Sequence, residues 1–220
     1  MASVLITGAN RGIGLELAKL YSRRGWRVTG VCRQSSPELD EAAARVIDGI
    51  DVTRPKDVAR LAELLNGDSL DLLINNAGLL QDEKLGSLDF DSIRTQIEVN
   101  ALAPLRVVET LLPNLGQGAK VANITSRMGS IADNDSGGRY GYRASKAALN
   151  AFGKSLAMDL KPRGIAVAQL HPGYVKTRMV NFGGLISPEE AARGLAERID
   201  GLTLANTGSF WHSNGDELPW

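Results

Sequence analysis

The sequence predicts an α/β protein with one doubly wound parallel sheet and helices on both faces. Short apolar runs alternate with segments of helical periodicity from one end to the other. A glycine-rich turn joins the first apolar run to the first helical segment, and no linker or internal repeat divides the 220 residues. Apolar strands joined by helices are typical of parallel sheets covered on both sides. We therefore expect residues 1–220 to form a single domain.

The first half of the chain is predicted to supply four strands and two helices. Glycine ends the first apolar run, and Gly25 ends the first helical pattern. Pro55 is a favourable first residue for the second helix. Asp48 and Gly49 interrupt the third strand, which is the weakest of the four. The expected strands cover residues 3–7, 27–32, 45–52 and 70–75, and the expected helices cover 13–24 and 55–65.

The second half alternates in the same way. Pro104 and Pro113 mark a kink and an end in a long helical segment, because proline lacks the amide hydrogen that a helix interior needs. Pro188 follows a serine cap at the start of the last helix. The expected helices cover residues 89–115, 141–160 and 188–199, and the expected strands cover 119–125, 165–170 and 208–212.

The composition excludes several classes of function. Lys and Arg total 25 and equal Asp and Glu, so no net charge favours nucleic acid or an acidic membrane. Cys32 is the only cysteine, which excludes an internal disulfide and a zinc cluster and suits a core residue. No apolar run could span a membrane. We expect a cytoplasmic protein without metal, nucleic-acid or membrane partners. His171 is expected to be a loop residue that hydrogen-bonds backbone groups. Neither His171 nor His212 is assigned a catalytic or metal-binding role.

The turn over residues 7–14 has the composition of a phosphate-binding loop. Gly8, Gly12 and Gly14 allow the backbone to approach a ligand closely. The helix that follows directs its N-terminal amides at the same point, which favours a pyrophosphate. The spacing differs from the Gly-x-Gly-x-x-Gly of the longer dehydrogenases. The strand–loop–helix context favours nucleotide binding over an ordinary glycine-rich turn.

Tyr142 and Lys146 lie four residues apart, and therefore on one face of a predicted helix. A phenol has a pKa of about 10, and a nearby ammonium group should lower it. The pair is thus a candidate proton donor and acceptor near neutral pH. The motif alone also fits a half-buried ring beside a solvated ammonium.

The end of the second strand indicates which cofactor is preferred. Sites for NAD usually place an acidic residue there, which binds the ribose 2′-hydroxyl. Here the strand ends in Arg33, and Arg11 lies in the glycine loop. Two guanidinium groups suit a 2′-phosphate, although surface arginines are also common. We predict a preference for NADP over NAD.

Together these motifs resemble the short-chain dehydrogenase/reductase family, in its order and spacings, over nearly the whole chain. The motifs are the loop over 7–14, Asn75-Asn-Ala-Gly78, Asn100, Ser126, Tyr142-x-x-x-Lys146 and Pro172-Gly173. The stretches 136–146, 171–177 and 214–220 are most similar to Sniffer-type carbonyl reductases and C-factor-like proteins. The resemblance implies a Rossmann-type fold and a homodimer or homotetramer.

The resemblance also implies a catalytic set. Tyr142 would exchange a proton with the substrate oxygen, and Lys146 would lower its pKa and hold the nicotinamide ribose. Ser126 would bind the substrate oxygen, and Asn100 would hold a water that relays protons. Ser126 as a strand-end cap and Asn100 as a helix residue bonded to backbone are the alternatives.

For the cofactor, the residues and the resemblance together indicate a set of contacts around the nucleotide. Asp51 and Val52 would lie at the adenine, although Asp51 could equally be a turn residue. Val175 and Thr177 would contact the nicotinamide carboxamide. The set is Gly8, Asn10, Arg11, Gly12, Ile13, Gly14, Arg33, Asp51, Val52, Asn75, Ala77, Gly78, Tyr142, Lys146, Pro172, Gly173, Val175 and Thr177.

The leading interpretation is an NADPH-dependent reductase of small-molecule ketones or aldehydes, which also oxidises the alcohols in reverse. The alternative is a C-factor-like signalling or interaction protein that binds nucleotide with the same fold, since fold does not decide function. Only residues 178–187 separate Thr177 from the last long helix. Such a short covering segment offers few substrate contacts and indicates an open cleft.

Overall fold

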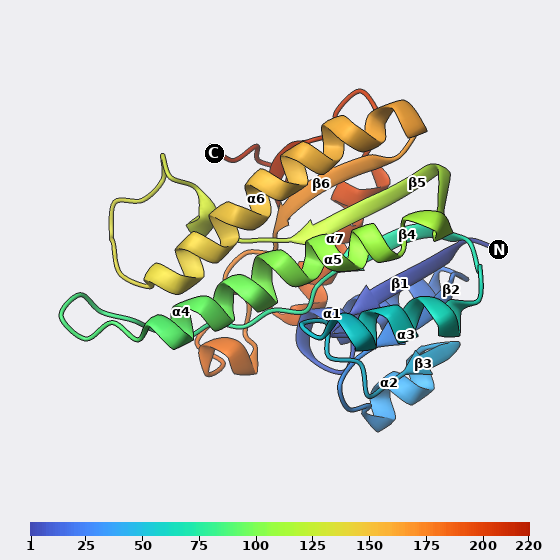
Figure 1. Ribbon diagram of the computed structural model, residues 1–220, viewed down its shortest axis with the longest axis horizontal. Coiled ribbons are helices and arrows are strands. Elements are labelled where there is room, and N and C mark those ends of the chain that lie inside the picture. Colours follow the sequence, from blue (N-terminus) through green and yellow to red (C-terminus); the bar gives the residue numbers. More distant parts are fainter.

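The computed structural model describes residues 1–220 and contains one sheet of seven parallel strands. The order across the sheet is β3-β2-β1-β4-β5-β6-β7, and Figure 1 shows it as a twisted layer between helices. The predicted doubly wound fold is confirmed. The strands are β1 (Ser3–Thr7), β2 (Arg27–Val31), β3 (Arg45–Ile47), β4 (Leu70–Asn75), β5 (Leu115–Ile124), β6 (Ala166–His171) and β7 (Ser209–His212).

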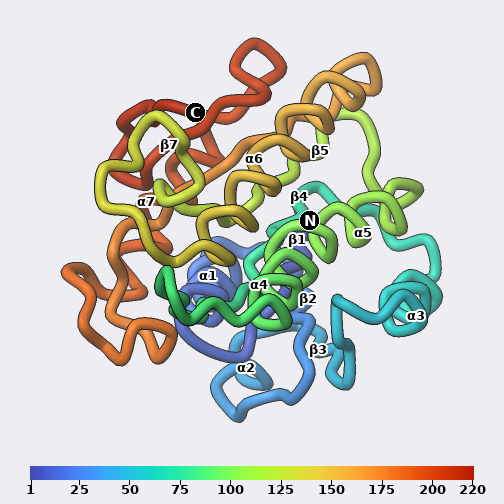
Figure 2. Tube along the Cα trace, turned by 60° about the vertical axis from the view of Figure 1, so that its left-hand side comes forward, coloured from blue at the N-terminus to red at the C-terminus, as the bar shows by residue number.

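Helices cover both faces of the sheet (Figures 1 and 2). One core cluster packs α1 (Gly12–Arg23), α2 (Pro37–Ala42) and α7 (Pro188–Asp200) against the sheet. The other packs α3 (Pro55–Leu65), α5 (Ala103–Thr110) and α6 (Tyr140–Leu160) against the opposite face. Strands buried on both faces are mostly apolar, which explains why the apolar runs of the sequence are nearly continuous and do not alternate with polar residues.

The strand order reverses at β1, which pairs with β2 on one side and with β4 on the other. The segments that follow β1 and β4 therefore leave the sheet at its carboxyl edge in different directions. In sheets of this kind the resulting crevice is the ligand site. The glycine loop follows β1, so the topology places it in this crevice.

Two predictions in the first half were wrong in detail. The third strand ends at Ile47 and does not reach residue 52, because Gly49 has a φ of +68° and turns the chain. Helix α2 was missed, although its start is encoded locally. The Ser36 hydroxyl accepts a hydrogen bond from the Leu39 amide, and Pro37 occupies the first turn.

The long helix expected over residues 89–115 is divided. It consists of α4 (Phe90–Ile97), a π-helical segment (Glu98–Leu102), α5 and a short 3₁₀ turn (Leu112–Asn114). Pro104 cannot donate the amide hydrogen that an α-helix would direct to the carbonyl of Asn100, so the predicted kink is a π segment. Strand β5 begins at Leu115, four residues earlier than the 119 expected. None of the helices combines the length and the apolar character needed to cross a membrane.

Candidate active site

The glycine loop is held tightly against the ends of two strands. The Gly8 amide donates to the Val31 carbonyl at 2.8 Å, and the Asn10 side chain donates to the Gln34 carbonyl at 2.9 Å. Gly8 has a φ of +66°, and a Cβ there would lie 2.9 Å from the Ala77 Cα. A Cβ on Gly14 would overlap the Gly8 carbonyl and the Asn76 side chain. These positions therefore require glycine for a close turn.

Asn76 belongs to the candidate site, although its sequence position did not single it out. Its side-chain amide donates to the carbonyls of Thr7 and Gly8, both at 3.0 Å, and its main-chain amide donates to the Thr7 hydroxyl at 3.1 Å. Asn76 thus clamps the glycine loop to the end of β4. The register of β1 with β4 places the residue after β4 beside Thr7, so the signal was available once the strand order was known.

Asn75 has a different environment from the one predicted. Its side chain is buried and donates to Asn123 at 2.9 Å, and Asn123 donates to Gln169 at 2.8 Å. These three amides cross β4, β5 and β6 in register. The Asn75 side chain is therefore committed to the sheet. Ala77 and Gly78 follow at the crevice, where the Ala77 amide donates to the Thr7 hydroxyl at 3.2 Å.

Arg11 and Arg33 are suited to a phosphate. Both are exposed, and neither forms an ion pair. The chain after β3 returns to the end of β2 through a bond from the Gly49 amide to the Arg33 carbonyl, at 3.2 Å. This brings the half-buried Asp51 and Val52 to the same edge. Free guanidinium groups beside a tight glycine loop fit a dinucleotide with a 2′-phosphate.

Asp51 is both a turn residue and a neighbour of Arg33. Its carboxylate accepts from the Thr53 amide at 3.0 Å and from the Thr53 hydroxyl at 2.7 Å. Burial acts to raise the pKa of Asp51, but the Thr53 hydrogen bonds and the charges of Arg33 and Arg54 bring it below its usual value. The Asp51 side chain is therefore a turn residue, as the alternative interpretation stated. Asp51 also lies near Arg33, at the predicted cofactor edge.

Ser126, Tyr142 and Lys146 lie together beside the crevice, and all are largely buried. The Lys146 ammonium lies 5.8 Å from the centre of the Tyr142 ring and donates to the Ile124 carbonyl at 2.8 Å. The Ser126 hydroxyl accepts from the Met128 amide at 3.1 Å and caps the turn after β5. The same hydroxyl acts to lower the pKa of Tyr142. The strand-end cap that the sequence left open as the alternative for Ser126 is therefore present, and its hydroxyl also faces Tyr142.

The predicted pKa of Tyr142 was wrong in direction for the protein without cofactor. Burial raises the pKa of Tyr142, and the Ser126 hydroxyl and the Arg139 charge oppose this without reversing it. Lys146 offsets this little, because its own burial lowers its pKa to about 7 and leaves it only partly charged at neutral pH. Desolvation disfavours the charged form of each group, and spacing along a helix cannot reveal it.

We expect the burial of Lys146 to make stability depend on pH. An unfolded lysine has a pKa of about 10.4, whereas burial lowers that of Lys146 to about 7. Between these values the unfolded chain holds a proton that the native state has lost, so stability rises with pH. Urea unfolding of cofactor-free wild type and Lys146→Met from neutral pH upward measures this. The stability of wild type relative to the variant should increase as the pH rises. A stability difference that stays constant with pH would contradict this expectation.

The Asn100 side chain bonds backbone, as the alternative interpretation stated. Its carbonyl oxygen accepts from the Leu79 amide at 2.8 Å. Its amide donates to the Leu79 carbonyl at 2.7 Å and to the Ser145 hydroxyl at 3.0 Å. These contacts occupy the side chain, so a water relay would have to use another atom of the residue.

The turn after β6 closes the crevice on the opposite side. Pro172 and Val175 are buried, and Gly173 has a φ of +91°. A Cβ on Gly12 would lie 3.5 Å from the Thr177 side chain, which brings the glycine loop and this turn together. The turn therefore reaches the predicted nicotinamide side of the glycine loop.

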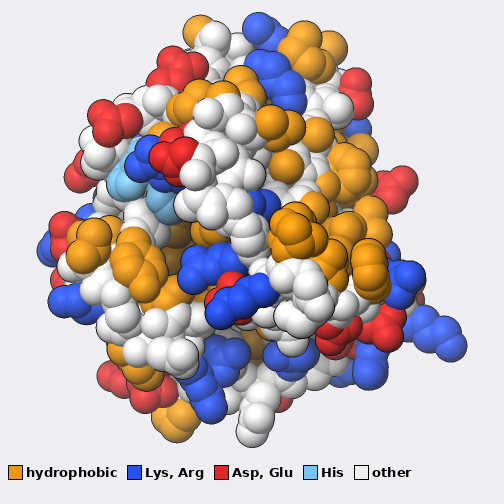
Figure 3. Space-filling model, turned by 90° about the vertical axis from the view of Figure 1, so that its left-hand side faces the viewer, with side chains coloured by type: hydrophobic (Ala, Val, Ile, Leu, Met, Phe, Trp, Pro, Cys, Tyr) orange, Lys and Arg blue, Asp and Glu red, His pale blue; other side chains and the backbone are white.

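The covering segment over residues 178–187 has regular local structure. It contains a 3₁₀ turn (Arg178–Val180), and Ile186 exchanges backbone hydrogen bonds with Tyr174 and Lys176. Its exposed apolar side chains are Met179, Phe182 and Leu185. On this face of the molecule two groups of hydrophobic side chains are separated by polar and cationic ones (Figure 3).

The two histidines form a pair near this site, with ring centres 4.8 Å apart and nearly perpendicular planes. They are the pale blue side chains of Figure 3. His171 is the last residue of β6, and its Nδ1 atom is buried without a hydrogen-bond partner, so the expectation that it satisfies backbone was wrong. Burial, with His212 and nearby cations, lowers the pKa of His171 to about 3, and it is therefore neutral. Cys32 is buried, as predicted.

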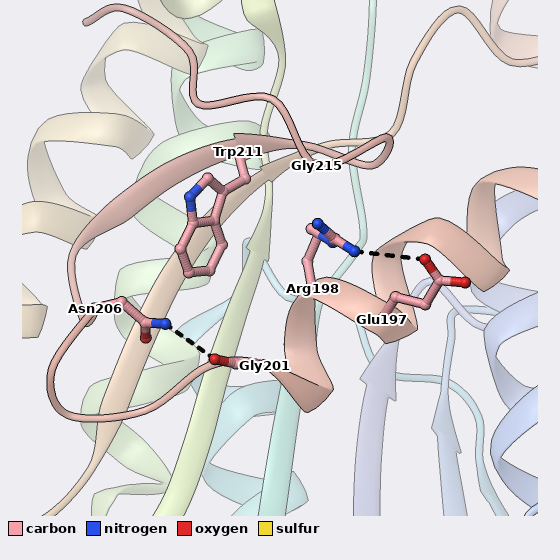
Figure 4. Close-up of a pocket in the computed structure, with 6 residues that line it drawn as sticks. All are labelled: Glu197, Arg198, Gly201, Asn206, Trp211 and Gly215. Atoms are coloured by element: carbon pink, nitrogen blue, oxygen red, sulfur yellow. Dashed lines mark hydrogen bonds and ion pairs between the residues drawn. The ribbon is translucent and has the colours of Figure 1, made fainter.

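A separate hollow of about 320 Å³ lies between α7 and β7 (Figure 4). The indole of Trp211 and the guanidinium of Arg198 lie on either side of it, and Arg198 pairs with Glu197 at 3.4 Å. Lys120, near the amino ends of the strands, donates to the carbonyls of Ile199 and Asp200. This part of α7 is therefore at the opposite end of the sheet from the crevice.

Comparisons with known proteins agree with this geometry. The family model described as short chain dehydrogenase matches residues 2–183. The chain is 43% identical to 1-hydroxy-2-glutathionyl-2-methyl-3-butene dehydrogenase of Rhodococcus sp. (strain AD45), over the whole of both chains. It is 44% identical to the C-signal of Myxococcus xanthus over 154 residues, 69% of this chain and 93% of that one.

Two solved structures are similar over the full length. The carbonyl reductase Sniffer of D. melanogaster superposes with a TM-score of 0.90 at 29% identity, covering all of both chains. A carbonyl reductase from Pseudomonas aeruginosa PAO1 in complex with NADP gives 0.88 at 34%, again over all of both chains. The resemblance inferred from the motifs is thereby confirmed, and the chain belongs to the short-chain dehydrogenase/reductase family.

Proposed function

We propose that residues 1–220 act as a single NADP-binding domain that reduces ketones or aldehydes and, in reverse, oxidises the alcohols. One observation carries the proposal: Tyr142, Lys146 and Ser126 converge, buried, at the crevice that the glycine loop borders. The relatives support the same chemistry, since they include a dehydrogenase and NADP-bound carbonyl reductase.

Each residue has a role that follows from its chemistry. When bound, NADPH supplies the hydride that reduces the carbonyl carbon. Tyr142 donates its hydroxyl proton to the carbonyl oxygen, and burial keeps that hydroxyl protonated at neutral pH. Ser126 holds the substrate oxygen by hydrogen bonding. Lys146 holds the nicotinamide ribose by donating hydrogen bonds from the same ammonium nitrogen that donates to the Ile124 carbonyl. Asn100 supports this arrangement through Ser145.

The remaining predicted residues bind the cofactor. Asn10, Ile13 and the three glycines form the pyrophosphate loop, and Asp51 and Val52 border the adenine. Ala77 and Gly78 line the adenosine side of the cofactor. Asn75 holds the end of β4 in place through its hydrogen bond to Asn123 within the sheet. Pro172, Gly173, Val175 and Thr177 form the nicotinamide side.

Arg33→Asp should shift the cofactor preference from NADPH toward NADH. The change removes a partner of the 2′-phosphate and adds a carboxylate that repels it, while the ribose 2′-hydroxyl of NADH gains an acceptor. We expect NADPH affinity to fall by about tenfold or more, with NADH affinity unchanged or higher. Titration of both cofactors measures this. Arg163→Asp, an exposed change elsewhere, is the control. A wild-type preference for NADH would refute the assignment.

The activity itself is tested by following NADPH oxidation with a panel of carbonyl compounds. The panel should include ketones, aldehydes and, because of the Rhodococcus relative, a carbonyl bearing a glutathione thioether. Turnover of at least one carbonyl supports the proposal. Tight NADPH binding without turnover of any of them would favour the signalling alternative, which the C-signal relative keeps relevant. The intact Ser126, Tyr142 and Lys146 disfavour that alternative.

We further propose a cytoplasmic homodimer or homotetramer. The single cysteine, Cys32, is buried and unpaired, which suits a reducing compartment. Exposed apolar residues on the outer helices, including Phe90 and Met158, suit contacts between subunits. Light scattering of the purified protein determines the assembly.

A further inference from the structure

A buried carboxylate lies at the start of the helix that carries Tyr142. Glu83 is 3% exposed and forms no ion pair. One of its oxygens accepts from the Gly141 amide at 3.0 Å. The other accepts from the Ser92 hydroxyl at 2.7 Å and from the Gln96 side-chain amide. A buried charge without a cation is costly unless hydrogen bonds satisfy it, so these donors hold Glu83 in one position.

Glu83 is the end of a regular set of hydrogen bonds, which we call the 79–83 ladder. Every second residue of the segment 79–83 bonds a residue of α4 or of the π segment. Leu79 bonds Asn100 through both its amide and its carbonyl, and the Gln81 amide donates to Gln96 at 2.9 Å. Two extended residues advance about 6.6 Å, and four helical residues about 6 Å. These two distances match. The bonds therefore recur at every second residue of the segment 79–83 and at every fourth residue along the helices, from Asn100 to Gln96 to Ser92.

Both ends of the 79–83 ladder reach the first turns of α6. At one end Glu83 accepts from Gly141, and at the other Asn100 donates to Ser145 at 3.0 Å. The Ser145 hydroxyl in turn donates to the Tyr142 carbonyl at 2.8 Å. Tyr142 therefore lies between the two attachment points.

Helix α6 depends on this external support at its start. Its N-cap residue, Arg139, provides no side-chain hydrogen bond, so Glu83 supplies the acceptor that the first amides need. A Cβ on Gly141 would lie 2.5 Å from the Gln96 side chain, so the contact between the two helices is close. A change at Glu83 or Gln96 would be felt directly at the turn that places Tyr142.

We propose that Glu83 and Gln96 are positioning residues for the reaction. They act through Gly141 and the first turn of α6, and they set where the Tyr142 hydroxyl stands relative to Ser126 and Lys146. The inference rests on the proposed role of Tyr142. Neither residue borders the glycine loop, so we expect their exchange to leave NADPH affinity nearly unchanged.

The exchange of the two side chains provides the test. In Glu83→Gln one amide hydrogen must face another donor, either the Gly141 amide or the Gln96 amide. The double variant Glu83→Gln/Gln96→Glu restores the pairing. The new amide accepts from Gly141 and donates to the new carboxylate, which still accepts from the Gln81 amide. Asp91→Asn, an exposed carboxylate of the same helix α4, is the control.

For Glu83→Gln we expect kcat with an accepted carbonyl to fall by about tenfold or more, since small misplacements of reacting groups are costly. The NADPH dissociation constant should stay within about twofold. The exchange variant should recover kcat to within about threefold of wild type. Asp91→Asn should match wild type.

Three results would overturn the inference. These are a folded Glu83→Gln enzyme with undiminished kcat, equal losses of kcat and NADPH affinity, or a folded exchange variant that stays slow. If Glu83→Gln alone does not fold, the kcat of the folded exchange variant decides. Failure of the proposed function is distinguishable, because wild type would then reduce no carbonyl or Tyr142→Phe would be as active as wild type.

Discussion

Tyr142→Phe should lower turnover by at least about a hundredfold, the lower end of what a general acid contributes. The variant keeps the ring and removes the hydroxyl that donates the proton. Because the ring is 8% exposed and packs as before, the fold should survive. NADPH affinity should also survive, because the glycine loop and Arg33 are unchanged. Steady-state rates with an accepted carbonyl and NADPH titration measure both quantities.

Tyr140→Phe is the matched control, since Tyr140 lies in the same first turn of α6 and is 40% exposed. It removes an equal hydroxyl two residues away and should leave turnover unchanged. Near wild-type turnover in Tyr142→Phe would remove Tyr142 from the mechanism. The pH profile adds a second readout. Burial raises the pKa of Tyr142, so reduction should not decline through loss of its proton until the pH is well above neutral.

Lys146→Met should differ from Tyr142→Phe by lowering NADPH affinity together with turnover. The change removes the proposed ribose contact and the ammonium that Tyr142 faces at 5.8 Å. We expect each quantity to fall by about tenfold or more, as for the loss of a charged hydrogen bond. The methionine fills the buried space, so unfolding is not the expected cause.

Lys161→Met, an exposed change just beyond α6, controls for the lost charge. NADPH binding to Tyr142→Phe and to Lys146→Met should also be compared without substrate. Unchanged NADPH affinity in Lys146→Met would assign the lysine to proton transfer only. Unchanged turnover would exclude it from the reaction.

Much of the site was predictable because its signals are local. Helical spacing placed Tyr142 and Lys146 on one face of α6, and Gly8 and Gly14 marked a close turn before a helix. Alternating apolar runs predicted the sheet and the helices on both faces. The order of the motifs predicted the family. Each of these signals is contained in a short stretch of residues, where spacing and side-chain type suffice.

Other features depend on contacts between distant segments, and only the tertiary structure decided them. Glu83 meets Gly141 and Asn76 meets Gly8 across 58 and 68 residues, respectively. Burial, not sequence spacing, raises the pKa of Tyr142 and lowers that of Lys146. The sequence by itself thus determined the fold class, which follows from local pattern, and indicated the candidate reacting groups, which follow from the order of the motifs. The partners and the protonation of those groups follow from packing, which no short stretch of sequence contains.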